Sequence, residues 1–350
     1  MLNWVPEKGI DSQIVNDYIA VSIKSNQFTN NGPCVQKLES LIRDKFRVSE
    51  SKAVVAVCNG SVALHILSEA ISLLYKKRLT WATQSFTFPP SAQCGLNKSK
   101  IIDIDDFEGP CLEELRNNDV DGLIVTNIFG NVIDINKYEN WAKTNGKILI
   151  FDNAATAYTF YKGRNAINYG HGSTISFHHT KPFGFGEGGA IICDKSLENN
   201  VRCLINFGIG LCEEEYYQPN GTNAKMSDIA AVYIIQHLLN NFHRIVDHHR
   251  YLYKYLRRRM NELKITHFRL FTSYHDLDDI VPACFAIILQ CDSEKYIKRL
   301  LKNNIYCRRY YYPLKMTLKA KQLFNSILCF PCTTDTTTAH IETILRLLSY

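Results

Sequence analysis

Short apolar runs alternate with amphipathic segments along the first two-thirds of the chain. Helical spacing of apolar residues predicts helices at 61–75 and 134–146, and Gly146 is typical of a residue that ends a helix. This alternation predicts an α/β fold with a mostly parallel central sheet, which binds ligands at the carboxyl ends of its strands. The apolar runs that predict buried strands span residues 53–60, 79–88, 100–106, 122–130, 147–155 and 173–177.

The pattern changes at Ser227. Apolar positions recur there at helical spacing as far as residue 263, and Ser227 is suited to be the N-cap of this long helix. Such a helix predicts a link between two domains. We expect a large ligand-binding domain with an N-terminal arm at 1–235 and a smaller C-terminal α/β domain at 236–350. The smaller domain is predicted to contain a strand at 282–292 and helices at 293–304 and 336–348.

Composition and charge narrow the class of protein. Of the 350 residues, 46% are hydrophobic, which is ordinary for a globular protein and too high for a disordered one. The formal charge of +6 is spread along the sequence, so we expect no nucleic-acid partner. No apolar run is long enough to span a membrane. The twelve cysteines show no short-domain disulfide spacing and follow no secretory leader, so we expect reduced thiols and a cytoplasmic location.

Three segments carry candidate chemistry. At 58–61 a strand turns into a helix, and its free N–H groups with the Ser61 hydroxyl form a potential anion site, although many strand–helix corners look alike. Asp152 ends an apolar strand, where a carboxylate needs a cationic partner; the alternative is a helix N-cap. Lys181 follows a strand and precedes several glycines. An amine in a confined site loses its proton more readily and can form an imine with an aldehyde. The alternative is that Lys181 is an ordinary loop lysine.

Together these features fit one cofactor, pyridoxal phosphate (PLP). PLP needs phosphate anchoring, ring stacking, a partner for its pyridine nitrogen and a lysine that forms an imine with its aldehyde. Asp152 and Lys181 meet the last two needs, and Phe86 or Phe88 is available for stacking. The residues suited to the phosphate are Gly60, Ser61 and Ser176.

Several segments, in order, resemble the DegT/StrS family of nucleotide-sugar aminotransferases, which are fold-type-I PLP enzymes. The most specific is the run from Ser176 through Lys181 to the glycines at 188–189. Within the family, the chain is most similar to transaminases that form viosamine or perosamine. The matching segments are 28–42, 59–65, 85–92, 101–106, 151–164, 176–192, 206–209, 223–231 and 310–314.

The resemblance implies a role for each matching residue. Lys181 would bind PLP covalently and then move protons, Asp152 would keep the ring nitrogen protonated, and Phe88 would stack on the ring. Asn223 matches a residue that reaches the phosphate from the neighbouring subunit, which implies a homodimer with active sites at the interface. The remaining matches are Gly60, Ser61 and Ser176 at the phosphate, and Thr29 and Lys225 near the substrate.

The chain departs from the family pattern at three places. Ala155 stands where the family usually has Gln or His near the ring oxygen of the cofactor, so that contact must come from elsewhere. Lys225 replaces an arginine, which puts carboxylate or substrate contacts there in doubt. The triplet 59–61 is Asn-Gly-Ser instead of the more common Ser-Gly-Thr, which keeps a hydroxyl donor.

The resemblance implies PLP-dependent transamination of a UDP- or dTDP-linked 4-keto-6-deoxyhexose. L-Glutamate would be the amino donor, and the product would be a 4-amino-4,6-dideoxy sugar nucleotide for glycan biosynthesis. Dehydratases of the family carry histidine in place of the lysine, so Lys181 favours transamination although His178 and His179 stand nearby. A PLP-dependent dehydratase and a non-catalytic regulator that binds sugar nucleotides are the alternatives.

Four histidines of the predicted long helix offer another alternative, a metal site. The step from His243 to His248 is five residues, which does not place both rings on one face of a helix, so we expect no metal. The four histidines are His237, His243, His248 and His249.

A further open question concerns Arg308 and Arg309, which could contact a pyrophosphate or form a salt bridge at the rim of the site.

Overall fold

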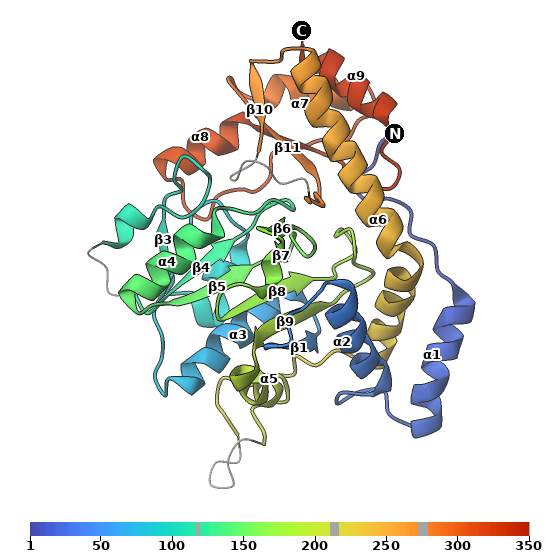
Figure 1. The fold of residues 1–350 in the computed structure, drawn as a ribbon, viewed down its shortest axis with the longest axis vertical. Helices are drawn as coiled ribbons and strands as arrows, with labels where there is room; N and C mark the ends of the chain where they lie inside the picture. Colours follow the sequence, from blue (N-terminus) through green and yellow to red (C-terminus); the bar gives the residue numbers. More distant parts are fainter. Residues whose placement is uncertain (117–119, 211–216, 272–278, 350) are drawn as a thin grey trace.

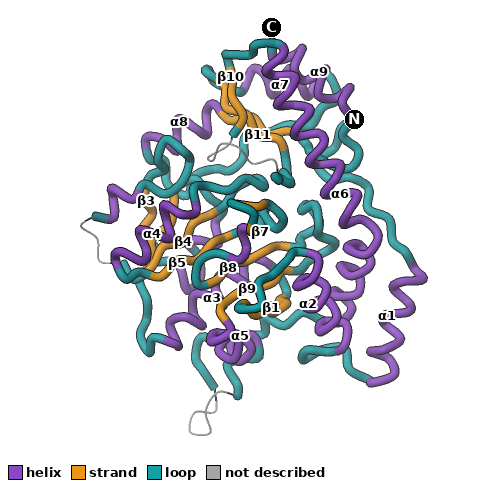
Figure 2. The backbone as a smooth tube through the Cα atoms, in the orientation of Figure 1, coloured by secondary structure: helices purple, strands orange, loops and turns teal. Residues whose placement is uncertain are grey.

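The computed structural model describes residues 1–116, 120–210, 217–271 and 279–349. A seven-stranded sheet of order β1-β9-β8-β5-β4-β2-β3 lies at its centre, with helices on both faces (Figures 1 and 2). In this sheet β9 runs antiparallel to both neighbours and the other neighbouring pairs are parallel, which confirms the predicted α/β fold. The strands are β1 (Lys52–Val57), β9 (Gly189–Asp194), β8 (Gly172–Ser176), β5 (Ile148–Asp152), β4 (Gly122–Thr126), β2 (Trp81–Gln84) and β3 (Lys100–Ile102).

The strand predictions need correction in two respects. The pattern analysis did not predict β9, because this strand begins at Gly189 within a glycine-rich stretch that resembles a loop. The strands predicted at 79–88, 100–106 and 122–130 are shorter, since β2, β3 and β4 end at Gln84, Ile102 and Thr126. Beyond β2 the Ser85 N–H still donates to the Ile102 carbonyl oxygen of β3 (2.8 Å), but the Ser85 carbonyl oxygen accepts from the Leu314 N–H (2.8 Å), so the chain leaves the sheet there and meets the C-terminal region.

Alternate residues of the central strands face two separate cores, as the period of a strand requires. Val54 and Ala56 of β1 pack with α2 and α6, whereas Val55 and Val57 pack on the opposite face with α3 and α5. The predicted helix end at Gly146 is confirmed by a left-handed C-cap with φ +59°. The helices of this part are α1 (Ser12–Ser25), α2 (Pro33–Lys45), α3 (Gly60–Leu74), α4 (Ile135–Asn145), α5 (Glu198–Ile205) and α6 (Asp228–Glu262).

Helix α6 is the predicted long helix, and the Ser227 side chain caps it by accepting a hydrogen bond from the Ala230 N–H. Its first half packs into the core under α2, and its second half packs into the core of the C-terminal region, so that it runs along one side of the molecule (Figure 1). The predicted domain boundary between residues 235 and 236 falls inside this helix and stays a prediction.

The C-terminal region has its own three-stranded antiparallel sheet of order β10-β11-β12. The N-terminal arm contacts this region outside the three-stranded sheet, because Leu2 forms a parallel β-bridge with Ile305. Among the described residues, no helix is both long and apolar enough to cross a membrane. The elements of this region are β10 (Phe268–Leu270), β11 (Phe285–Leu289), β12 (Ile327–Phe330), α7 (Glu294–Lys302), α8 (Leu318–Ser326) and α9 (Thr338–Leu348), and a small hairpin of β6 (Phe160–Tyr161) and β7 (Arg164–Asn165) completes the fold.

Candidate active site

A cavity of about 590 Å³ opens at the carboxyl ends of β1, β4, β5 and β8. This is the edge where a parallel sheet binds its ligands. Tyr310 and Tyr311 of the C-terminal region form part of its wall. The predicted residues that line it are Gly60, Ser61, Phe88, Asp152, Ser176 and Lys181.

Asp152 is the last residue of β5, and its side chain lies inside the protein with 5% of its surface exposed. Its Oδ1 accepts hydrogen bonds from the Ala154 N–H (3.0 Å) and the Thr174 hydroxyl (3.4 Å). Turns and the hairpin strand β6 follow it, so the alternative of a helix N-cap is wrong. Among the described residues, no cation comes within salt-bridge distance of this carboxylate. Burial raises its pKa, against the opposing effects of the Ala154 hydrogen bond and the Lys181 charge.

Lys181 lies on the loop between β8 and β9, and its side chain enters the same cavity. Burial lowers the pKa of its amine, while the carboxylate of Asp152 acts in the opposite direction. A lowered pKa increases the fraction of free amine, which is the nucleophilic and proton-accepting form. The two side chains therefore share one cavity without an ion pair, and burial shifts the pKa of each toward its neutral form.

The corner before α3 is shaped by two glycines. A Cβ atom on Gly60 would lie 2.8 Å from the Cβ of Ser176, and one on Gly189 would lie 2.6 Å from the backbone carbon of Asn59. Only residues without side chains allow β8, β9 and the start of α3 to approach so closely. The first N–H groups of α3 have no partner within the helix, so this corner is suited to a phosphate.

The structure separates the two candidate stacking residues. Phe88 lines the cavity with 44% of its surface exposed, and its ring centroid lies 5.5 Å from that of Tyr311. Phe86 is fully buried in a core cluster with residues such as Ile104 and Ile327. Phe88 is therefore the residue in a position to cover a ring held in the cavity.

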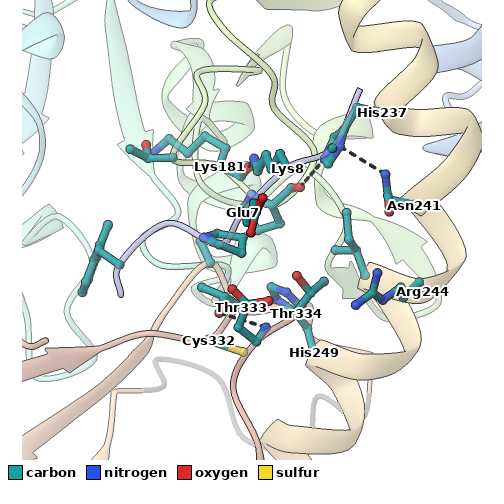
Figure 3. A pocket seen from close by; sticks show the side chains of 18 residues that line it. Glu7, Lys8, Lys181, His237, Asn241, Arg244, His249, Cys332, Thr333 and Thr334 are labelled. Atoms are coloured by element: carbon teal, nitrogen blue, oxygen red, sulfur yellow. Dashed lines mark hydrogen bonds between the residues drawn. The ribbon is translucent and has the colours of Figure 1, made fainter. Parts of the chain in front are cut away.

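Sequence reasoning missed Lys8, which holds the Lys181 loop from behind. Its ammonium group donates hydrogen bonds to the carbonyl oxygens of His179 (2.7 Å), Lys181 (2.8 Å) and Gly184 (2.5 Å). Figure 3 shows it beside Lys181, in a pocket that is also lined by α6. Burial lowers its pKa to about 8. A single lysine in the N-terminal arm carries no sequence signal for such a role, since its partners lie more than 170 residues away.

Thr29, Asn223 and Lys225 do not line this cavity. Thr29 and Asn223 are exposed, and Lys225 borders a separate groove of about 150 Å³ together with Asn31. The Lys225 ammonium donates to the Asn206 Oδ1 (2.7 Å). Within one chain, the structure therefore does not bring these three residues to Lys181.

The histidines of α6 have other partners. His249 donates from Nδ1 to the Pro282 carbonyl oxygen (2.8 Å), and His237 contacts the Pro182 carbonyl oxygen from Nε2 (3.0 Å). Burial lowers the pKa of both rings to about 4, so they are neutral near pH 7. Across the part of the chain that the structure describes, no three His, Cys, Asp or Glu side chains are grouped to hold a metal ion.

Comparisons with known proteins identify the family and the fold. The model of the DegT/DnrJ/EryC1/StrS aminotransferase family matches residues 10–348. The chain is 25% identical to a dTDP-4-amino-4,6-dideoxy-D-glucose transaminase of Shigella dysenteriae, over 94% of this chain and 93% of that protein. It is 26% identical to a GDP-perosamine synthase of Escherichia coli O157:H7, over 61% of this chain and 60% of that protein. A crystal structure of DesI with its TDP-sugar product has a similar fold, with a TM-score of 0.83 at 22% identity over 99% of this chain and 92% of that chain.

Proposed function

The chain belongs to the DegT/DnrJ/EryC1/StrS aminotransferase family of PLP-dependent enzymes, and from that premise we propose that it aminates a nucleotide-linked keto-sugar. The proposed substrate is a UDP- or dTDP-linked 4-keto-6-deoxyhexose, and the proposed donor is L-glutamate. The observation that carries the proposal is that Asp152 and Lys181 line one cavity, together with a glycine-shaped corner suited to a phosphate.

The residues of the cavity fit PLP. The corner at Gly60 and Ser176 would hold the phosphate, Phe88 would cover the ring, and the unpaired carboxylate of Asp152 would meet the protonated ring nitrogen. When bound, PLP supplies an aldehyde that reacts with amines and a ring that takes up electrons. Lys181 would provide the amine for that aldehyde.

The chain's own groups would then control the protons. In the donor half-reaction the free amine of Lys181 would accept the proton from the Cα of the amino donor. In the second half-reaction the ammonium form of Lys181 would donate a proton to the sugar carbon that receives the amino group. Asp152, kept from water by burial, would hold the proton on the ring nitrogen. Phe88 and Tyr311 would limit the access of water to the reacting atoms.

The first experiment is the visible absorption spectrum of the PLP-loaded protein before and after addition of L-glutamate. We expect a yellow band that glutamate bleaches, and the Lys181→Ala variant should lack both the band and keto-sugar amination. NMR of the product would show which carbon carries the amino group. Glutamate-dependent turnover by Lys181→Ala would overturn the proposal, and a deoxygenated product without an amino group would indicate the dehydratase alternative.

We also propose that the enzyme is a homodimer, with Asn223 of one subunit at the phosphate corner of the other. The exposure of Asn223 and Thr29 supports this arrangement, since neither residue reaches the cavity of its own chain. The segment that carries Asn223 runs next to the end of β1, where the Cys58 N–H donates to the Ala224 carbonyl oxygen (2.9 Å). It therefore lies near the outer side of the phosphate corner.

A further inference from the structure

A small recess of about 70 Å³ adjoins the main cavity behind Lys181. The recess and the cavity share Ala155, Lys181, Tyr310 and Tyr311 in their walls, so a ligand held at Lys181 can extend a small group into it. The recess is far smaller than the main cavity of about 590 Å³, so it suits a small group such as a carboxylate better than a sugar ring.

Arg308 forms the far wall of this recess together with Trp4. Its guanidinium carbon lies 4.3 Å from the ring centroid of Trp4, 4.9 Å from that of Tyr306 and 5.4 Å from that of Tyr310. Its backbone is fixed to β12, because its N–H donates to the Cys329 carbonyl oxygen (3.0 Å) and its own carbonyl oxygen accepts from the Cys329 N–H (2.8 Å). The aromatic cage and the backbone pair therefore hold the side chain in one place.

The Arg308 guanidinium has no anionic partner in the described part of the chain, and its Nε is buried without a hydrogen-bond partner. The neighbouring Arg309 is different, because it forms an ion pair with Asp292 and donates from Nε to the Ser293 hydroxyl (2.9 Å). A buried donor without a partner costs free energy, so an anion that entered the recess would bind favourably. The salt-bridge alternative therefore describes Arg309, whereas the buried Nε–H of Arg308 is left without an acceptor.

We propose that this recess binds the α-carboxylate of the amino donor and that Arg308 is the residue that holds it. The inference rests on the proposed transamination and names the chemical class of the donor, an α-amino acid. In such a donor the carboxylate lies two covalent bonds from the reacting nitrogen, so its binding site must adjoin Lys181, as the recess does. The pyrophosphate of a sugar nucleotide lies a whole sugar ring away from the reacting carbon and does not meet this condition. A guanidinium fork also matches a carboxylate in shape and charge.

The test measures the two half-reactions of the PLP-loaded enzyme separately, in the wild type and in Arg308→Gln. Bleaching of the visible band by L-glutamate, L-glutamine or L-alanine reports the donor half-reaction. We expect Arg308→Gln to lower its second-order rate constant by about 10- to 100-fold, the usual effect of losing a hydrogen bond between charged groups. The second half-reaction, in which the pyridoxamine form aminates dTDP-4-keto-6-deoxyglucose, should keep its wild-type rate in Arg308→Gln. Maleate is an unreactive dicarboxylate. Calorimetry should show that it binds Arg308→Gln correspondingly more weakly than it binds the wild type.

Arg309→Gln is the matched control, because it removes an adjacent arginine that already has a carboxylate partner. It should leave the donor half-reaction unchanged, and Arg308→Lys should recover part of the lost rate. An intact band in each variant shows that it is folded and loaded. Bleaching at the wild-type rate in Arg308→Gln, or an equal loss in the keto-sugar half-reaction, overturns the carboxylate site alone. A wild-type band that none of the three amino acids bleaches overturns the proposed function and the carboxylate site together.

Discussion

Two lysines of this chain show how differently one protein can place the same side chain. Lys181 is half-buried and lines the cavity that Asp152 also lines, whereas Lys225 borders an outer groove, donates a hydrogen bond to Asn206 and lies 4.3 Å from the ring centroid of Phe207. Burial lowers the pKa of both amines, but only that of Lys181 is opposed by a neighbouring carboxylate. The comparison teaches that a single chain brings Asp152 and Lys181 to one cavity and leaves Thr29, Asn223 and Lys225 outside it.

The largest expected effect of the variants below is at Asp152. Asp152→Ala removes the carboxylate that would hold a proton on the cofactor's ring nitrogen, so we expect amino transfer to fall by about 10²- to 10³-fold, as for the loss of other preorganised electrostatic groups. Single-turnover bleaching by L-glutamate measures this effect. Lys225→Ala in the outer groove should reduce this donor step far less. Equal losses in the two variants would contradict the difference between the two regions.

A second test addresses the support of the Lys181 loop. Lys8→Met keeps much of the side-chain volume but leaves three backbone carbonyls without their donor. We expect a loss of about 1–3 kcal/mol in the free energy of unfolding, together with a slower donor half-reaction. Chemical denaturation measures the first effect, and single-turnover bleaching by L-glutamate measures the second. A change in the pH dependence of the visible band would show in addition that the Lys181 amine has moved.

Lys225→Met is the control for this change, since Lys225 has a single hydrogen bond and lies outside the cavity. It should lower stability by less than Lys8→Met and leave the pH dependence of the band unchanged. A Lys8→Met protein that is less stable but has the wild-type pH dependence would show that Lys8 supports the fold alone and does not position Lys181.

Sequence reasoning succeeded where the chemistry and its supporting pattern lie close together in the chain. Asp152 at the end of an apolar strand and Gly60 at a strand–helix corner could be located from local patterns, because parallel strands bring their carboxyl ends to one edge. The Lys8 contacts could not be predicted, because they join segments more than 170 residues apart through backbone carbonyls, which have no sequence signature. For the same reason the pattern gave no hint that Arg308 stands in an aromatic cage, since Trp4 comes from the opposite end of the chain.

A third effect, of similar size, is expected at the corner formed by Gly60 and Ser176. Gly60→Ala would place a Cβ 2.8 Å from that of Ser176, so the corner must open by several tenths of an ångström. We expect a cost of about 1–3 kcal/mol, shared between stability and PLP affinity. Equilibrium dialysis of PLP and thermal unfolding measure the two parts. Gly9→Ala is the control, because nothing lies within 4 Å of the added atom; equal effects of the two substitutions would contradict the crowded corner.

The smallest expected effect belongs to Asn223, and it tests whether the outward-facing side completes the site of a partner. Asn223→Ala would remove one hydrogen bond to the phosphate, so PLP affinity should fall by about 2- to 10-fold. In a mixed dimer of the Asn223→Ala and Lys181→Ala chains, a contact between subunits gives one site with Lys181 and with Asn223 from the other chain. That site should bind PLP with wild-type affinity. A contact within one chain would instead leave every Lys181-bearing site with the weakened affinity, and the outer segment would then belong to the fold of its own subunit.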